Sequence, residues 1–196
     1  MPDIPKLGTP TEGDRTKETL HQAMGEAISA WADLEAHVAG LFHFFVSIDQ
    51  AGAIALGAYG TIDSFYNQLQ MMKGAAHVFF QRAGDVTHQW PDGSKTSYQK
   101  ELITFANRCQ KLSEIRNNIV HGRIDIDPSI GGREIEGYCL VPHVYDKKNK
   151  NGPEYVYSSK ELKLFATAFE FRPALLNTIF RYAFEKQKAW REKPPR

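Results

Sequence analysis

The chain has 196 residues, with 24 Lys and Arg against 23 Asp and Glu and a formal net charge of +1. This balance gives no overall positive charge that would attract nucleic acid, so any such affinity must come from local groups of basic residues. No apolar run approaches the length of a membrane span, and from the acidic, proline-containing start we expect no signal peptide.

The spacing of apolar residues predicts a mainly α protein, a four-to-five-helix up-and-down bundle with a small antiparallel β insert. We expect one domain over 14–190, between a disordered leader at 1–13 and a basic tail at 191–196. Long helices are predicted over 16–47, 61–83, 97–121 and 158–190. The last of these begins with a capping box, Ser158 and Glu161, and is kinked or restarted at Pro173.

The remaining stretches are shorter and less regular. Residues 51–60 are small and glycine-rich, which suits a tightly packed helix or a loop, and 84–96 form a turn-rich loop. Alternating, β-branched and aromatic residues predict the β insert at about 122–157, with a turn at Gly131 and Gly132.

One cation lies where the helix over 97–121 calls for an apolar side chain. At about 100° per residue, Arg116 falls at the centre of a stripe formed by Leu102, Phe105, Cys109, Leu112 and Val120. A guanidinium without compensation is very costly in such a stripe. Arg116 therefore needs a compensating group.

Glu35 is the partner that the sequence offers. It falls in the middle of an apolar face of the helix over 16–47, which carries Met24, Ile28, Trp31, Val38, Phe42 and Val46. Two long helices with one opposite charge each on an apolar face predict a buried Glu35–Arg116 pair. The pair would either fix the register of two helices or belong to a functional site, and the helical wheel alone leaves both interpretations open.

Three polar residues form a ridge beside the stripe. Ser113, Asn117 and His121 follow each other at intervals of four residues, so they share one helix face. His121 stands just before Gly122, a natural helix stop, at a carbonyl-rich end that favours a protonated imidazole. A single histidine there is typical of a helix cap, but the nearby arginine and asparagine give more chemistry than a cap requires.

The segment Arg116-Asn117-x-x-x-His121 resembles the signature of the HEPN superfamily, a name that stands for higher eukaryotes and prokaryotes nucleotide-binding. The segment from Trp31 to Glu35 is similar to a Trp-x-x-Leu-Glu stretch common in bacterial members. The likeness covers the helical frame, residues 16–123 and 158–190, and the Arg-to-His spacing is its diagnostic part.

The resemblance implies a metal-independent RNA endonuclease in which two protomers bring both motifs to one cleft. His121 would assist proton transfer from a ribose 2′-OH, or orient it, as the hydroxyl attacks the adjacent phosphate. Arg116 would neutralise the phosphorane, and Asn117 would orient these groups. Glu35 would fix Arg116 or join the acid–base chemistry.

The partners expected from the resemblance are RNA and a second copy of the chain, without a cofactor. Toxins and phage-defence effectors occur in the family, so an antitoxin or another defence-system protein is a further candidate partner. The alternative, from a different class, is a non-catalytic HEPN-like module for dimerisation or for binding RNA or nucleotides. In that module the Glu35–Arg116 pair would be structural.

Further RNA contacts are expected from Ser113, Arg123 and the lysines Lys147, Lys148 and Lys150. Many toxins of the family carry, two residues after the histidine, a tyrosine that a partner nucleotidyltransferase modifies. Arg123 stands there in this chain, so that control is not expected, and the arginine would instead meet the RNA backbone. The lysine turn and nearby tyrosines would guide single-stranded RNA, or the insert would be a structural lid with a solvated turn.

The remaining histidines and the cysteines indicate no metal site. No H-x-x-x-H or Cys/His spacing of zinc ligands occurs. Cys109 lies in a predicted helical core and Cys139 in a predicted strand, so both are expected as thiols in a reducing compartment. The sequence thus predicts a cytoplasmic protein without membrane contact.

Overall fold

The computed structural model describes residues 4, 8–47, 51–90, 92–146, 152–170 and 174–192. The chain divides into two compact units, residues 1–34 with 111–171 (unit 1) and residues 35–110 with 172–196 (unit 2). Helices α1 (Lys17–Val46) and α4 (Tyr98–His121) each contribute residues to both. The predicted mainly α fold is confirmed, since the described strands form only short antiparallel pairs. The single domain predicted over 14–190 stays a prediction.

Unit 1 combines helical segments with the predicted β insert. Its strands are β3 (Gly122–Ile126), β4 (Ser129–Ile130), β5 (Arg133–Glu134) and β6 (Tyr138–Pro142). β3 pairs with β6 in a register that runs from Gly122 opposite Pro142 to Ile126 opposite Tyr138. The predicted turn between β4 and β5 is confirmed: Gly131 and Gly132 have φ of 60° and 78°, values that suit glycine in a tight hairpin.

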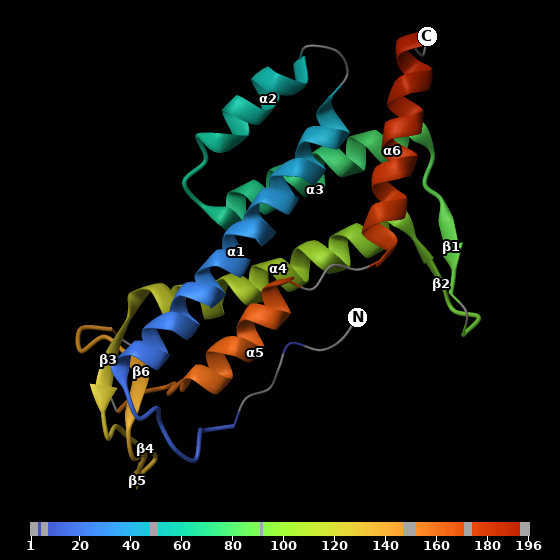
Figure 1. The fold of residues 1–196 in the computed structure, drawn as a ribbon. Helices are drawn as coiled ribbons and strands as arrows, with labels where there is room; N and C mark the ends of the chain where they lie inside the picture. The colour runs from blue at the N-terminus through green and yellow to red at the C-terminus, as the bar shows by residue number, and fades with distance from the viewer. Residues whose placement is uncertain are drawn as a thin grey trace. The chain divides into compact units, whose positions relative to one another are not determined.

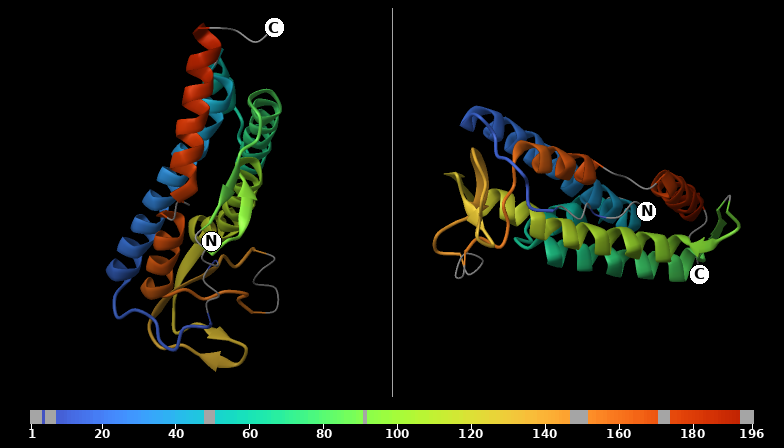
Figure 2. Two further views of the ribbon diagram at one scale, coloured as in Figure 1. Left: turned by 90° about the vertical axis from the view of Figure 1, so that its right-hand side faces the viewer. Right: turned by 90° about the horizontal axis from the view of Figure 1, so that it is seen from below.

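The core of unit 1 has two parts. On the sheet, Ile135, Cys139, Val141 and Val156 form a buried cluster. On the helices, the first half of α1 lies alongside α5 (Ser159–Glu170), as the views in Figures 1 and 2 agree. Trp31 of α1 meets Phe169 of α5 edge to face, with ring centroids 5.3 Å apart. Aromatic contact between these two helices therefore fixes the segment of α1 that carries Trp31.

The predicted capping box at the start of α5 is confirmed. The Ser158 backbone N–H donates to Glu161 Oε2 over 2.9 Å. Asp14, far away in the sequence, adds a second cap, since its carboxylate accepts from the Ser159 backbone N–H over 2.7 Å. Gly13 and Asp14 also bond the backbone of Glu136 and Tyr138. The end of the predicted leader is thus tied to the sheet and to α5, while residues 1–3 and 5–7 lie outside the described residues.

Unit 2 contains α2 (Ala51–Gly60), α3 (Phe65–Ala83), β1 (Thr87–Gln89), β2 (Lys95–Ser97) and α6 (Ala174–Glu192). The glycine-rich stretch 51–60 is therefore a helix. Its core is aromatic: Phe79 lies within 5.5 Å, centroid to centroid, of Phe45, Phe80 and Trp190. Aromatic packing joins α3 to α6 and to the end of α1.

The loop predicted at 84–96 contains a short hairpin, which corrects the prediction. β1 and β2 pair antiparallel, Thr87 opposite Ser97. Asp92 accepts from the Ser94 backbone N–H, and Gly93 has a φ of 83°, so local polar chemistry closes the turn. The strands were missed because three polar residues each carry no apolar alternation.

The chain between α5 and α6 includes Pro173, so the kink predicted there lies outside the described residues. Of the predicted tail at 191–196, residues 191–192 close α6 and the others are also outside them. Within the described ranges, every helix is too short or too polar to cross a membrane.

Candidate functional site

The predicted motif occupies the last turns of α4, in unit 1. The helix ends at His121 and β3 begins at Gly122, without a loop between them. A side chain at position 122 would come within 2.8 Å of the Asn118 backbone oxygen and 2.7 Å of Leu140 Cδ1. Only glycine fits at position 122, because the chain there passes close to both the helix backbone and the side chain of Leu140. This close approach places His121 directly before the first residue of β3.

The motif side chains differ in exposure. Asn117 and His121 are exposed, whereas Ser113 and Arg116 are half-buried. Neither the Asn117 amide nor the His121 imidazole hydrogen-bonds another described residue. The polar ridge predicted from the spacing thus faces solvent at its last two positions, and both groups are accessible to a ligand.

Arg116 lies over an aromatic ring. Its guanidinium carbon is 5.2 Å from the centroid of the Trp31 ring, which in turn packs against Phe169. A cation over an indole face is stabilised by roughly 0.5–2 kcal/mol. Trp31, which the sequence analysis placed on the apolar face of its helix, therefore holds Arg116 at the edge of unit 1.

Glu35 is half-buried and lies at the margin of the buried face of α1, between the fully buried Leu34 and Val38. Trp31, Val38 and Phe42 of the predicted stripe are buried, and the central place of Glu35 in it stays a prediction. Within unit 2 the pKa of Tyr59 is raised, mainly because Tyr59 is buried and next because of the negative charge of Glu35. Glu35 and Arg116 belong to different units, and their pairing stays a prediction.

Asn118 is a structural residue that the sequence analysis missed. Its amide nitrogen donates to the Tyr157 hydroxyl over 3.1 Å, and its backbone oxygen accepts from the Tyr155 hydroxyl over 3.0 Å. The two tyrosine rings stack with centroids 4.9 Å apart. The segment 155–157 therefore buttresses the end of α4 through Asn118. The role of Asn118 could not be predicted from the sequence, because its tyrosine partners are far from it along the chain and form no local pattern with it.

Burial also corrects the idea that these tyrosines stack on RNA. Tyr155 is buried and Tyr157 half-buried, while Tyr145 is 91% exposed. Only Tyr145, of the three, presents its ring to solvent. Lys147, Lys148 and Lys150, predicted to contact RNA, lie outside the described residues.

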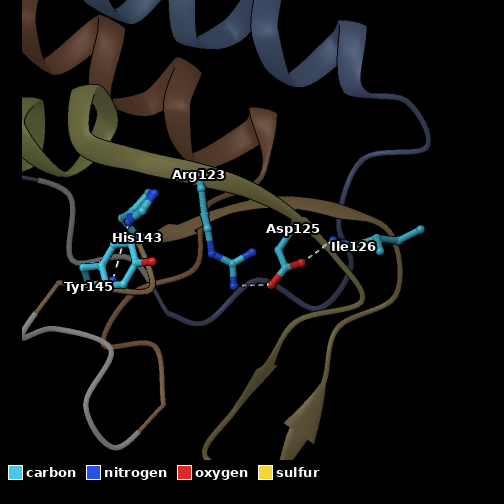
Figure 3. A network of polar contacts seen from close by, with 5 residues as sticks. All are labelled: Arg123, Asp125, Ile126, His143 and Tyr145. Atoms are coloured by element: carbon cyan, nitrogen blue, oxygen red, sulfur yellow. Dashed lines mark hydrogen bonds and ion pairs between the residues drawn. The ribbon is translucent and has the colours of Figure 1, made fainter.

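Arg123 lies on β3, two residues after His121, and forms an ion pair. One of its guanidinium nitrogens is 2.7 Å from Asp125 Oδ2, and both side chains are about one-third exposed (33% and 34%). Figure 3 shows the two side chains turned toward each other along β3. The pair leaves other donors of the guanidinium available, but its charge is partly neutralised, so Arg123 is a weaker phosphate ligand than a solitary arginine.

The chemistry of this surface is that of cations and imidazole. Among the described residues, no group of three or more His, Cys, Asp or Glu side chains could hold a metal ion. Cys109 and Cys139 are buried, one in each unit. Burial raises the pKa of the Cys139 thiol to about 12, with smaller contributions from Asp14 and Glu161, so this thiol stays protonated at neutral pH. The exposed groups that can bind or move a proton near neutral pH are therefore histidines.

Comparison with models of protein families, with curated proteins and with solved structures finds no match to this chain. The resemblance to the HEPN superfamily therefore depends on the motif residues and their placement.

Proposed function

We propose that the protein is a metal-independent endoribonuclease of the HEPN type, which cleaves RNA through the ribose 2′-OH. The observation that supports it best is the arrangement at the end of α4. An exposed imidazole, His121, and an exposed amide, Asn117, accompany a guanidinium, Arg116, which lies over the Trp31 ring. Imidazole, amide and guanidinium are the groups that this cleavage requires.

In the proposed reaction, the 2′ oxygen attacks the adjacent phosphorus and forms a 2′,3′-cyclic phosphate as the bond to the 5′ oxygen breaks. His121 accepts the 2′-OH proton, because a neutral imidazole is a competent base near neutral pH. Arg116 neutralises the phosphorane oxygens, and a guanidinium matches them in geometry. Asn117 donates to a phosphate oxygen. DNA lacks the attacking hydroxyl and is not a substrate.

The proposal includes a homodimer in the cytoplasm, with RNA as substrate and an antitoxin or other defence-system protein as regulator. Val120, directly before His121, is 48% exposed, and Ile126 on β3 is 57% exposed. Apolar side chains next to an exposed polar site support a surface that a second copy covers. Ser113 and Arg123 would extend the RNA surface beyond the three central residues.

The test is RNA cleavage in the presence of EDTA by the wild type, Arg116→Ala and His121→Ala. We expect cleavage by the wild type and a loss of about 10²–10⁴-fold in each variant, the range for removing an acid–base group. The products should end in a 2′,3′-cyclic phosphate, detected by mass spectrometry. His21→Ala, an exposed histidine on α1, is the matched control and should cleave as the wild type does.

Equal activity in all four proteins would exclude this nuclease mechanism. The second candidate function, a non-catalytic module for binding RNA or a second copy, is favoured by the Trp31 contact of Arg116 and the Asp125 contact of Arg123, because both also serve as structural contacts. RNA binding without cleavage by the wild type, measured by fluorescence anisotropy, would support the module instead.

A further inference from the structure

A second histidine lies next to the motif, brought there by the sheet. His143 is the residue that follows β6, and His121 is the residue that precedes β3. Because Gly122 pairs with Pro142, the two histidines are the next positions outward on the two strands. Paired Cα atoms lie about 4.5–5.5 Å apart and consecutive ones 3.8 Å, so the two histidine Cα atoms are at most about 13 Å apart.

The His143 side chain is accessible and oriented. The residue is exposed, and its ring lies 5.4 Å, centroid to centroid, from the Tyr145 ring. The Tyr145 backbone N–H lies 3.5 Å from Nδ1, at the long limit of a hydrogen bond, and this weak contact is given up when the ring is protonated on both nitrogens. Figure 3 shows His143 beside Tyr145 in the chain after β6, next to the Arg123 side chain of β3.

Among the described residues, the charged and titratable groups near His143 come from three parts of unit 1. His121 ends α4, Arg123 and Asp125 form an ion pair on β3, and Tyr145 and Asp146 follow in its own loop. The Arg123–Asp125 ion pair is close to neutral in sum.

We infer that His143 supplies the second imidazole of the cleavage site and acts as the general acid for the 5′ oxygen. The inference rests on the proposed nuclease function. As the 2′ oxygen forms its bond to phosphorus, His121 takes the 2′ proton. As the bond from phosphorus to the 5′ oxygen breaks, protonated His143 gives its Nε2 proton to that oxygen. One proton is taken and one given, so the enzyme carries the same net charge before and after the step.

A two-histidine site makes a prediction that a single histidine does not. The base must be neutral and the acid protonated, so kcat/KM follows a bell-shaped dependence on pH. Of the described histidines in unit 1, His21 is the third, on the second turn of α1, and it is exposed. His21→Gln therefore matches His143→Gln in chemistry and exposure without lying on the sheet edge.

The experiment compares His143→Gln, His121→Gln and His21→Gln on an RNA that the wild type cuts. Glutamine keeps a polar donor but cannot titrate. We expect His143→Gln to lower kcat/KM by about 10²–10⁴-fold and to remove the alkaline limb of the pH profile. His21→Gln should behave as the wild type does.

The same RNA with a bridging 5′ sulfur at the cut separates acid from base, because a thiolate leaves without needing a proton. His143→Gln should then cleave almost as fast as the wild type, whereas His121→Gln should stay slow. If His121→Gln is impaired but His143→Gln keeps the wild-type rate and pH profile, the role of His143 is excluded and the nuclease proposal stands. If the sulfur substrate does not rescue an impaired His143→Gln variant, general-acid catalysis by His143 is likewise excluded. If the wild type cuts no RNA, the nuclease proposal itself fails.

Discussion

Asn117 and Asn118 follow one another on the last turns of α4, yet their side chains have opposite surroundings. The Asn117 residue is exposed, and its side-chain amide makes no hydrogen bond to another described residue. Asn118 is half-buried, and its amide and backbone oxygen are bonded by the hydroxyls of Tyr157 and Tyr155. One helix turn thus presents a face that is available to a ligand and a face that is committed to the fold.

The committed face is aromatic and includes a cavity. A volume of about 250 Å³ in unit 1 is lined in part by Ile115, Tyr155, Tyr157, Phe165 and Glu154. Its one charged lining residue is acidic, which disfavours an RNA phosphate there. The available face carries cations and imidazoles. In this unit the accessible polar groups, rather than this cavity, therefore mark the candidate site of chemistry.

The largest expected difference between the two faces is the effect on stability of replacing Ile119 or His121 by alanine. Ile119 is fully buried, so Ile119→Ala should lower the free energy of unfolding by about 2–5 kcal/mol through lost burial and a cavity. His121→Ala, at an exposed position, should change it by about 0.5 kcal/mol or less. Urea unfolding followed by circular dichroism measures both. A large loss of stability in His121→Ala would mean that the imidazole serves the fold, and would weaken the functional interpretation.

A smaller difference is expected between the two asparagines. Asn118→Ala removes the donor to Tyr157 and should lower the free energy of unfolding by about 1–2 kcal/mol relative to Asn117→Ala. Both changes raise helix propensity equally, so the difference between the variants reports the hydrogen bond alone. In the cleavage assay the order should reverse, with Asn117→Ala the slower enzyme. Equal stability of the two variants would contradict the assignment of faces.

The features that the sequence predicted correctly are each local to a single helix. The end of α4 at His121 and the capping box at Ser158 both follow from spacing within a few residues. These features depend on helix geometry and on terminal backbone groups, which the neighbouring residues determine.

What the sequence did not predict depends on contacts between distant residues. A helical wheel gives the direction of the Arg116 side chain but not the residue on a neighbouring helix that it meets. Glu35 was predicted as its partner because of its charge, whereas the Trp31 ring, four residues before Glu35, was not recognised as a partner. The bond from Asn118 to Tyr157 spans 39 residues. The approach of β6 to the end of α4 depends on strand register, which alternation along a single strand leaves undetermined.

The smallest expected effect is a loss of stability that is absent at neutral pH and develops only in alkaline solution. Burial raises the pKa of Tyr155 and of Tyr157, and raises that of Cys139 from its ordinary value near 9 to about 12. The folded protein then holds protons that the unfolded chain releases, so stability is complete below about pH 9 and falls as the pH rises further. Urea unfolding from pH 7 to 11 should show this decline.

The two kinds of tyrosine sharpen that measurement. Tyr155→Phe removes a buried hydroxyl that donates to Asn118, so it should cost about 1 kcal/mol at pH 7 and make the alkaline decline shallower. Tyr145→Phe, at a position 91% exposed, should change neither quantity. A decline of the same steepness in wild type and Tyr155→Phe would mean that this hydroxyl titrates alike in the folded and unfolded states. The buttress behind α4 would then be open to water, and the contrast between the two faces of the helix would rest on Ile119 and Asn118 alone.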